Sequence, residues 1–217
     1  PAGAVIPSAR TGGTIITGWA GNTMQKINEL ILEIKKLEEE LSLEIQKKEK
    51  EFYYKVQGKK IYFEEAARQY QKTLVTRLHT YLLEAPLLNI LTTPIIWSCM
   101  VPAVFLDLVI SIYHAVCFPV YGIPKVNRND FIIIDRHALP YLNLIEKINC
   151  VYCGYFNGLI AYVQEIAART EQYWCPIKHA RKTGTLHSRY LHFLEYGDAK
   201  AFKEGIEKIR RDFDDLK

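Results

Sequence analysis

A run of forty residues with almost no charge constrains this chain more than any other feature. From Ala85 to Pro124, Asp107 is the only formally charged side chain. A helix of that length would measure about 60 Å, roughly twice the ~30 Å hydrocarbon core of a bilayer. The run therefore predicts a membrane-embedded segment that crosses twice as a hairpin, or once with interfacial flanks. The alternative is a buried helix pair inside a water-soluble fold.

The prolines of this run favour the hairpin. They stand at positions 86, 94, 102, 119 and 124. Each lacks a backbone donor and disfavours helix in the residue before it, so breaks are expected near Thr93 and Val101. Basic residues flank both ends of the run, which fits a hairpin with both soluble parts in the cytoplasm.

Asp107 has a different environment in each of these two topologies. In a hairpin, it lies near the far-side turn and reaches water. In a single span, it lies at mid-membrane, where an ionised side chain is costly and should face protein or a wet cavity. His114, seven residues later, then shares its helical face.

Composition sets the broad class of the chain. Its 217 residues, 49% hydrophobic and 24% charged, fit one or two compact units and exclude a disordered, collagen-like or disulfide-scaffold protein. The net charge is only +4, and the basic residues form no concentrated stripe. No nucleic-acid partner is therefore predicted.

The N-terminal part divides into a short leader and a helical arm. Residues 1–23 have neither a charged n-region nor a long apolar core, and we expect a flexible arm or an added leader. Residues 24–84 are expected to form amphipathic helices, interrupted at Gln57-Gly58 by a small hairpin or a simple break. Five apolar residues occupy successive a and d positions of about two and a half heptads: Ile27, Leu30, Ile34, Leu37 and Leu41. This stripe predicts a short coiled coil or a bundle helix, and it leaves self-association and packing within the chain both open.

Residues 125–217 contain a candidate metal site. Cys150 and Cys153 form a C-x2-C pair, and Cys175 and His179 follow later. Three thiolates and an imidazole suit tetrahedral zinc, and they could also hold an iron–sulfur cluster. Thiols stay reduced in the cytoplasm, so a metal is favoured over a disulfide. A redox thiol pair and plain packing of buried cysteines are the alternatives.

The expected local fold complicates that site. Residues 142–152 and 158–174 read as two helices, with Gly154 and Asn157-Gly158 at the turn, which predicts an antiparallel helical hairpin. A second helix of about 25 Å would hold Cys153 far from Cys175. The hairpin would instead assemble a rival cluster: Asp135, His137, Cys175 and His179.

The block from Asp135 to Ala180 resembles a group of uncharacterised bacterial membrane proteins. The likeness is carried by NCVYCGYFNGLIAYV and RTEQYWCPIKHA, and it extends from about Met24 to the C-terminus. It implies a bacterial inner-membrane location and no particular mechanism.

Together these features predict a mainly α-helical membrane protein with a lipid bilayer and a second copy, or a partner membrane protein, as its contacts. A membrane-anchored assembly or scaffold role with a structural Cys/His zinc site is the first hypothesis. A metal-dependent or redox membrane enzyme, or an accessory subunit of one, is the second. No Ser-His-Asp, phosphate-loop or dinucleotide motif is present, so catalytic residues are unknown.

Overall fold

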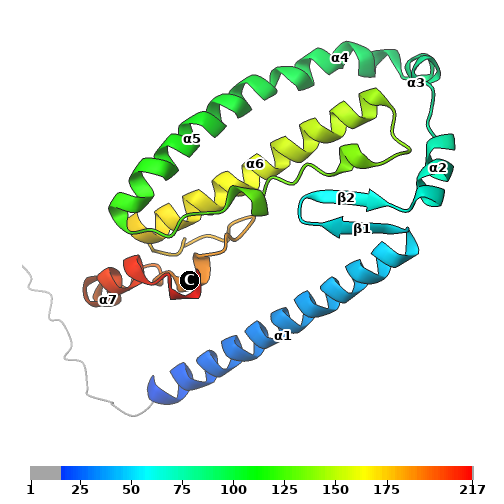
Figure 1. Ribbon diagram of the computed structural model, residues 1–217. Helices are drawn as coiled ribbons and strands as arrows, with labels where there is room; N and C mark the ends of the chain where they lie inside the picture. Colours follow the sequence, from blue (N-terminus) through cyan, green and yellow to red (C-terminus); the bar gives the residue numbers. More distant parts are fainter. Residues whose placement is uncertain (1–15, 217) are drawn as a thin grey trace, which may run out of the picture. The chain divides into compact units, whose positions relative to one another are not determined.

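The computed structural model describes residues 16–216 and is mainly helical (Figure 1). Its helices and strands are α1 (Ile16–Glu51), β1 (Tyr54–Gln57), β2 (Lys60–Phe63), α2 (Glu65–Thr73), α3 (Leu78–Glu84), α4 (Leu87–Ser98), α5 (Met100–Tyr121), α6 (Leu144–Trp174) and α7 (Ala199–Arg211). Single 3₁₀ turns lie at Arg128–Asp130, Arg136–Ala138, Tyr190–His192 and Asp214–Leu216. The first fifteen residues of the predicted 1–23 leader lie outside the described residues. Residues 16–23 belong to α1.

The chain divides into two compact units. The first unit comprises the residues up to Gly58 together with residues 62–67, which include α1 and most of the hairpin. The second unit comprises residues 59–61 and all residues from Arg68 onward. In the first unit, the α1 helix is followed by the two-stranded hairpin β1–β2, whose turn contains Gly58 at a φ of 60°. A left-handed φ favours glycine, which confirms the hairpin interpretation of Gln57-Gly58.

The apolar run forms two consecutive helices, α4 and α5, that meet at Cys99. The predicted membrane hairpin is therefore wrong, because residues 87–121 contain no reversing turn. Pro94 lies inside α4, where the hydroxyls of Thr92 and Thr93 donate to the carbonyls of Leu88 and Asn89. Hydroxyl bonds of this kind help a helix tolerate proline. Pro102 falls in the first turn of α5, where a missing N–H costs little.

A long connection leads from α5 back along the second unit before α6 begins. We call residues 122–143 the return segment. It opens at Gly122, whose φ of 70° closes α5, and the Ile123 N–H donates to the Phe118 carbonyl at 2.9 Å. It ends at Asn143, which forms a reciprocal capping box with Glu146 at the start of α6.

α5 and α6 run parallel, and the return segment runs back between their ends. Tyr152 bonds to the Ile96 carbonyl near the start of both helices, and Tyr173 stacks on Tyr121 near their ends. Figure 1 shows the two helices side by side. The core of the unit lies between them: Ala103, Phe118, Ile123, Val126, Leu159, Tyr162, Ile166 and Phe213 are all buried.

α6 is one continuous helix of 31 residues, so the predicted C-terminal helical hairpin is wrong. The glycines that we interpreted as a turn lie inside this helix for another reason. A Cβ atom on Gly158 would stand 2.6 Å from the Phe131 carbonyl oxygen, and one on Gly154 would stand 3.0 Å from that of Ile133. Both glycines let the backbone of the return segment lie directly on α6.

Candidate functional site

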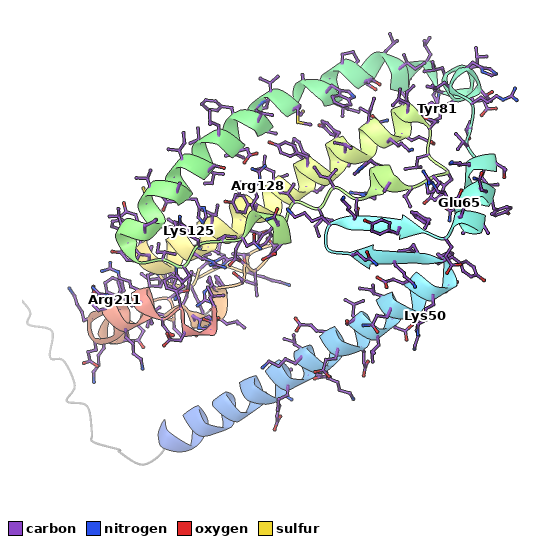
Figure 2. All side chains as sticks on the ribbon, viewed as in Figure 1. Lys50, Glu65, Tyr81, Lys125, Arg128 and Arg211 are labelled. Atoms are coloured by element: carbon purple, nitrogen blue, oxygen red, sulfur yellow. The ribbon has the colours of Figure 1, made fainter. Side chains whose placement is uncertain are left out.

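The most polar part of the second unit lies between α5, the return segment and α6. Asp107, on the inward face of α5, is its centre. Arg128 donates to the Asp107 carboxylate at 2.6 Å, and the Tyr155 hydroxyl of α6 donates to the same oxygen at 2.8 Å. Figure 2 labels Arg128 on the return segment. Asp107 thus faces other parts of the same chain, as expected for a single apolar helix, and it ties three elements together.

His114 lies on the same face of α5 as Asp107, two helical turns later. Its Nε2 accepts the backbone N–H of Val126 at 2.9 Å, so this nitrogen carries no proton and the ring is neutral. Its Nδ1 lies 3.3 Å from the Tyr162 hydroxyl. Phe118 and Tyr162 pack edge-on against the imidazole ring. His114 therefore holds the return segment against α5, and both ring nitrogens are engaged.

A buried ion pair on α6 fastens the same end of the return segment. Arg169 and Glu165, four residues apart on α6, meet at 2.8 Å with side chains only 10% and 11% exposed. The sequence predicts this i,i+4 pair. The Arg169 guanidinium also donates to the carbonyls of Pro124 and Lys125, while Ser188 donates to Glu165 at 2.6 Å. The pair thus connects α6 to segments on both sides of it in the chain.

The C-terminus is fixed by a second arginine, which sequence reasoning missed. Arg189 is buried and donates through both terminal nitrogens to the Asp215 carboxylate, at 2.5 and 3.0 Å. It also bonds to Gln172, a fully buried residue of α6. These hydrogen bonds hold the pKa of Asp215 below its ordinary value. Arg189 lies in a polar, irregular stretch of sequence, so no periodicity marks it as buried.

The structure does not bring together the four predicted metal ligands. Cys150 and Cys153 lie in the first third of α6, whereas Cys175 caps its far end. Twenty-two residues of continuous helix separate Cys153 from Cys175 by about 33 Å. His179 lies beyond Cys175, where its backbone N–H donates to the Tyr190 hydroxyl. One ion cannot contact donors so far apart within one chain.

The rival cluster is also separated along α6. Asp135 precedes the 3₁₀ turn Arg136–Ala138 and His137 lies within it, next to the first half of α6, while Cys175 and His179 follow the other end of α6. Within residues 16–216, no three His, Cys, Asp or Glu side chains gather as a metal-binding group.

A cavity of about 530 Å³ lies where α4 meets α5. Its wall is mostly apolar and aromatic and includes Trp97, Met100, Ile134 and Tyr152. His137 and Lys147 supply its basic groups.

The apolar surface of α4 and α5 is the largest exposed feature of the described chain. Leu87–Tyr121 is the one helical stretch among the described residues that is long and apolar enough to cross a membrane. Only 6% of its most apolar window is buried within the chain. A core helix of a water-soluble protein would be mostly buried, so the alternative of a buried helix pair does not describe this segment.

Comparison of the chain with protein-family models, with curated proteins and with solved structures found no match.

Proposed function

We propose that this chain is a membrane-anchored assembly protein. The observation that carries the proposal is the apolar surface of α4 and α5, which the rest of the chain leaves uncovered. Exposed side chains follow one stripe of α5 from end to end: Val101, Phe105, Leu108, Ile112, Val116 and Val120. Monomeric soluble proteins seldom leave so long an apolar surface in water.

The polar residues of α5 support the same assignment. Asp107 and His114 lie on the inward face, together with the buried Ala103 and Phe118. At 100° per residue, this face is opposite the exposed stripe. Polar groups that turn toward protein while apolar groups turn outward are typical of a helix in contact with lipid.

The assembly part of the proposal rests on α1. Its a and d residues whose side chains the structure describes, Leu30, Ile34, Leu37 and Leu41, are each roughly half exposed. A second copy of α1 would cover them in a short coiled coil. Lys36 and Glu40, outside the a and d positions, form an i,i+4 ion pair that suits the solvent side of such a coiled coil.

For location, we propose the cytoplasmic side of the bacterial inner membrane. The resemblance of the C-terminal block to bacterial membrane proteins and the free state of Cys150, Cys153 and Cys175 support this assignment. We propose no metal site within one chain, because α6 holds Cys150 and Cys153 far from Cys175.

Flotation with phospholipid vesicles tests the anchoring. The full chain should float with vesicles of phosphatidylcholine and phosphatidylglycerol, and the double variant Phe105→Glu/Ile112→Glu should lose most of this binding. The matched control is Leu191→Glu/Tyr196→Glu, which places two charges on equally exposed apolar residues away from α5. Equal flotation of both double variants, with unchanged helicity, would remove the basis for the proposal.

A further inference from the structure

The direction of α5 relative to the bilayer follows from what lies beside it. If α5 stood across the membrane, every segment packed along its length would occupy the same depth. α5 has 22 residues and is about 33 Å long, close to the ~30 Å hydrocarbon thickness. Its neighbours therefore decide whether it can cross.

The return segment follows α5 along its whole length. Val126 bonds to His114, and Arg128 bonds to Asp107 at the middle of the helix. Farther along, Ile134 and His137 line the same cavity as Met100, at the start of α5. The segment thus passes every level of the helix.

This segment is unsuited to hydrocarbon. Lys125, Asp130 and Arg136 are charged and exposed. Its backbone is extended or in single 3₁₀ turns, so neither a helix nor a closed sheet satisfies its N–H and C=O groups. Ionised side chains and lipid-exposed irregular backbone are both strongly disfavoured at membrane depth.

The apolar stripe and the return segment lie on opposite sides of α5. The stripe contains Phe105 and Ile112, whereas the return segment touches Asp107 and His114, about half a turn away around the helix. The surroundings of α5 therefore change from apolar to polar from one side of the helix to the other, and they stay the same from its start to its end. A packed unit with one apolar and one polar side suits an interface that runs parallel to the helix axis, because only the apolar side can lie in hydrocarbon.

We propose that α5 lies in the plane of the membrane, with its outward stripe in the acyl chains of one leaflet and the return segment and α6 on the aqueous side. This inference rests on the proposed membrane anchoring and adds the topology: the chain is attached to one face of the bilayer and does not cross it.

Depth measurements on spin labels test this topology. All five native cysteines are replaced by Ala in the full chain, and single cysteines are introduced by Val101→Cys, Phe105→Cys, Ile112→Cys, Val116→Cys and Val120→Cys. The labelled protein is added to preformed vesicles of phosphatidylcholine and phosphatidylglycerol. Collision rates with oxygen and with a water-soluble nickel chelate then give the depth of each label.

In-plane binding predicts similar depths for all five labels. A spanning helix predicts depths that increase from Val101 to the middle of α5 and decrease toward Val120, which would overturn the inference. Labels shielded from both collision partners would show that a second copy covers the stripe, and would overturn it as well.

A second measurement uses the return segment. In the same cysteine-free background, Asp130→Cys should react with a membrane-impermeant maleimide added outside the vesicles, as fast as the aqueous reference Lys200→Cys on α7. Loss of this reactivity on vesicle binding would contradict the inference. Flotation of each sample separates the two proposals: protein that does not float refutes the anchoring, whereas protein that floats with a spanning depth profile refutes only the topology.

Discussion

Single residues in the second unit have two main roles. Residues of the first kind leave room for another segment to approach a helix, and residues of the second kind pair a buried charge. Gly158 belongs to the first kind, because its missing side chain leaves room for the backbone of Phe131 and Ile132. Asp107, Arg169 and Arg189 belong to the second, and His114 joins two segments as a neutral ring. Each connects elements that are far apart in the chain, which periodicity in the sequence does not reveal.

Gly158→Ala should destabilise the fold although alanine is the better helix former. Its Cβ would approach the Ile132 Cα within 2.7 Å, and backbone cannot rotate away as a side chain can. We expect an overpacking cost on the order of 1–3 kcal/mol, measured by denaturant unfolding in mild detergent. Gly205→Ala is the matched control in α7, where the nearest atom is 4.0 Å away, and it should be neutral or stabilise by up to ~1 kcal/mol. Equal effects of both would refute the close-approach explanation.

The Arg189–Asp215 pair should make stability depend on pH in the acid range. Because the pair holds the Asp215 pKa below its ordinary value, its contribution is fully present above about pH 4 and is lost as pH falls through the lowered pKa. Asp215→Asn should therefore lower the melting temperature at neutral pH, and its difference from the unaltered chain should shrink toward pH 3. A constant difference across this range would argue against the ion pair.

At the scale of elements, periodicity predicts which segments are helical better than it predicts where they end. The mainly helical class and the apolar segment are confirmed. The small hairpin is confirmed as well. Strong local signals decide these features.

The errors arose where tertiary contacts override local preference. Gly154, Asn157 and Gly158 are typical turn residues, yet they lie inside α6. The backbone of the return segment packs directly on α6 at Gly154 and Gly158, where the helix carries no side chain. Pro94 suggests a break, yet α4 continues through it. The break expected near Val101 lies two residues earlier, at Cys99, where α4 ends and α5 begins. The rival cluster depends on the predicted hairpin, whereas the site of Cys150, Cys153, Cys175 and His179 rests on spacing alone. Spacing does not show that one continuous helix separates the ligands.

The length of α6 has a direct consequence for metal content. Since Cys153 and Cys175 are about 33 Å apart, purified protein should carry no stoichiometric zinc or iron that depends on both ends of the helix. Elemental analysis of the unaltered chain, Cys150→Ser/Cys153→Ser and Cys175→Ser measures this. One metal per chain that disappears in both variants would show that α6 bends or that chains share a site.

The α1 stripe should control self-association. Ile34→Lys/Leu41→Lys places charge in the expected seam and should reduce the mass of the protein–detergent complex to that of a monomer, as measured by light scattering. Glu39→Lys, on the opposite side of α1 by the heptad spacing, is the control and should leave the mass unchanged. A multimer that survives the double substitution would assign assembly to another surface.

For the whole molecule, the exposed apolar area governs solubility. Dilution of the detergent below its critical micelle concentration should send the unaltered chain into the pellet, because the α4–α5 surface has no other cover. Phe105→Glu/Ile112→Glu should remain in the supernatant to a larger extent. Sedimentation of both to the same extent would show that the α5 stripe does not set this behaviour.

Because α5 precedes α6 in the chain, the ribosome makes α5 before the helix that packs along it. Tyr162, which contacts His114, is made 48 residues after it, and at 5–20 residues per second this delay lasts roughly 2–10 s. Throughout that interval, the nascent chain presents an apolar helix whose inward face α6 does not yet cover. A chaperone or the membrane itself must therefore shelter α5 before its own fold can.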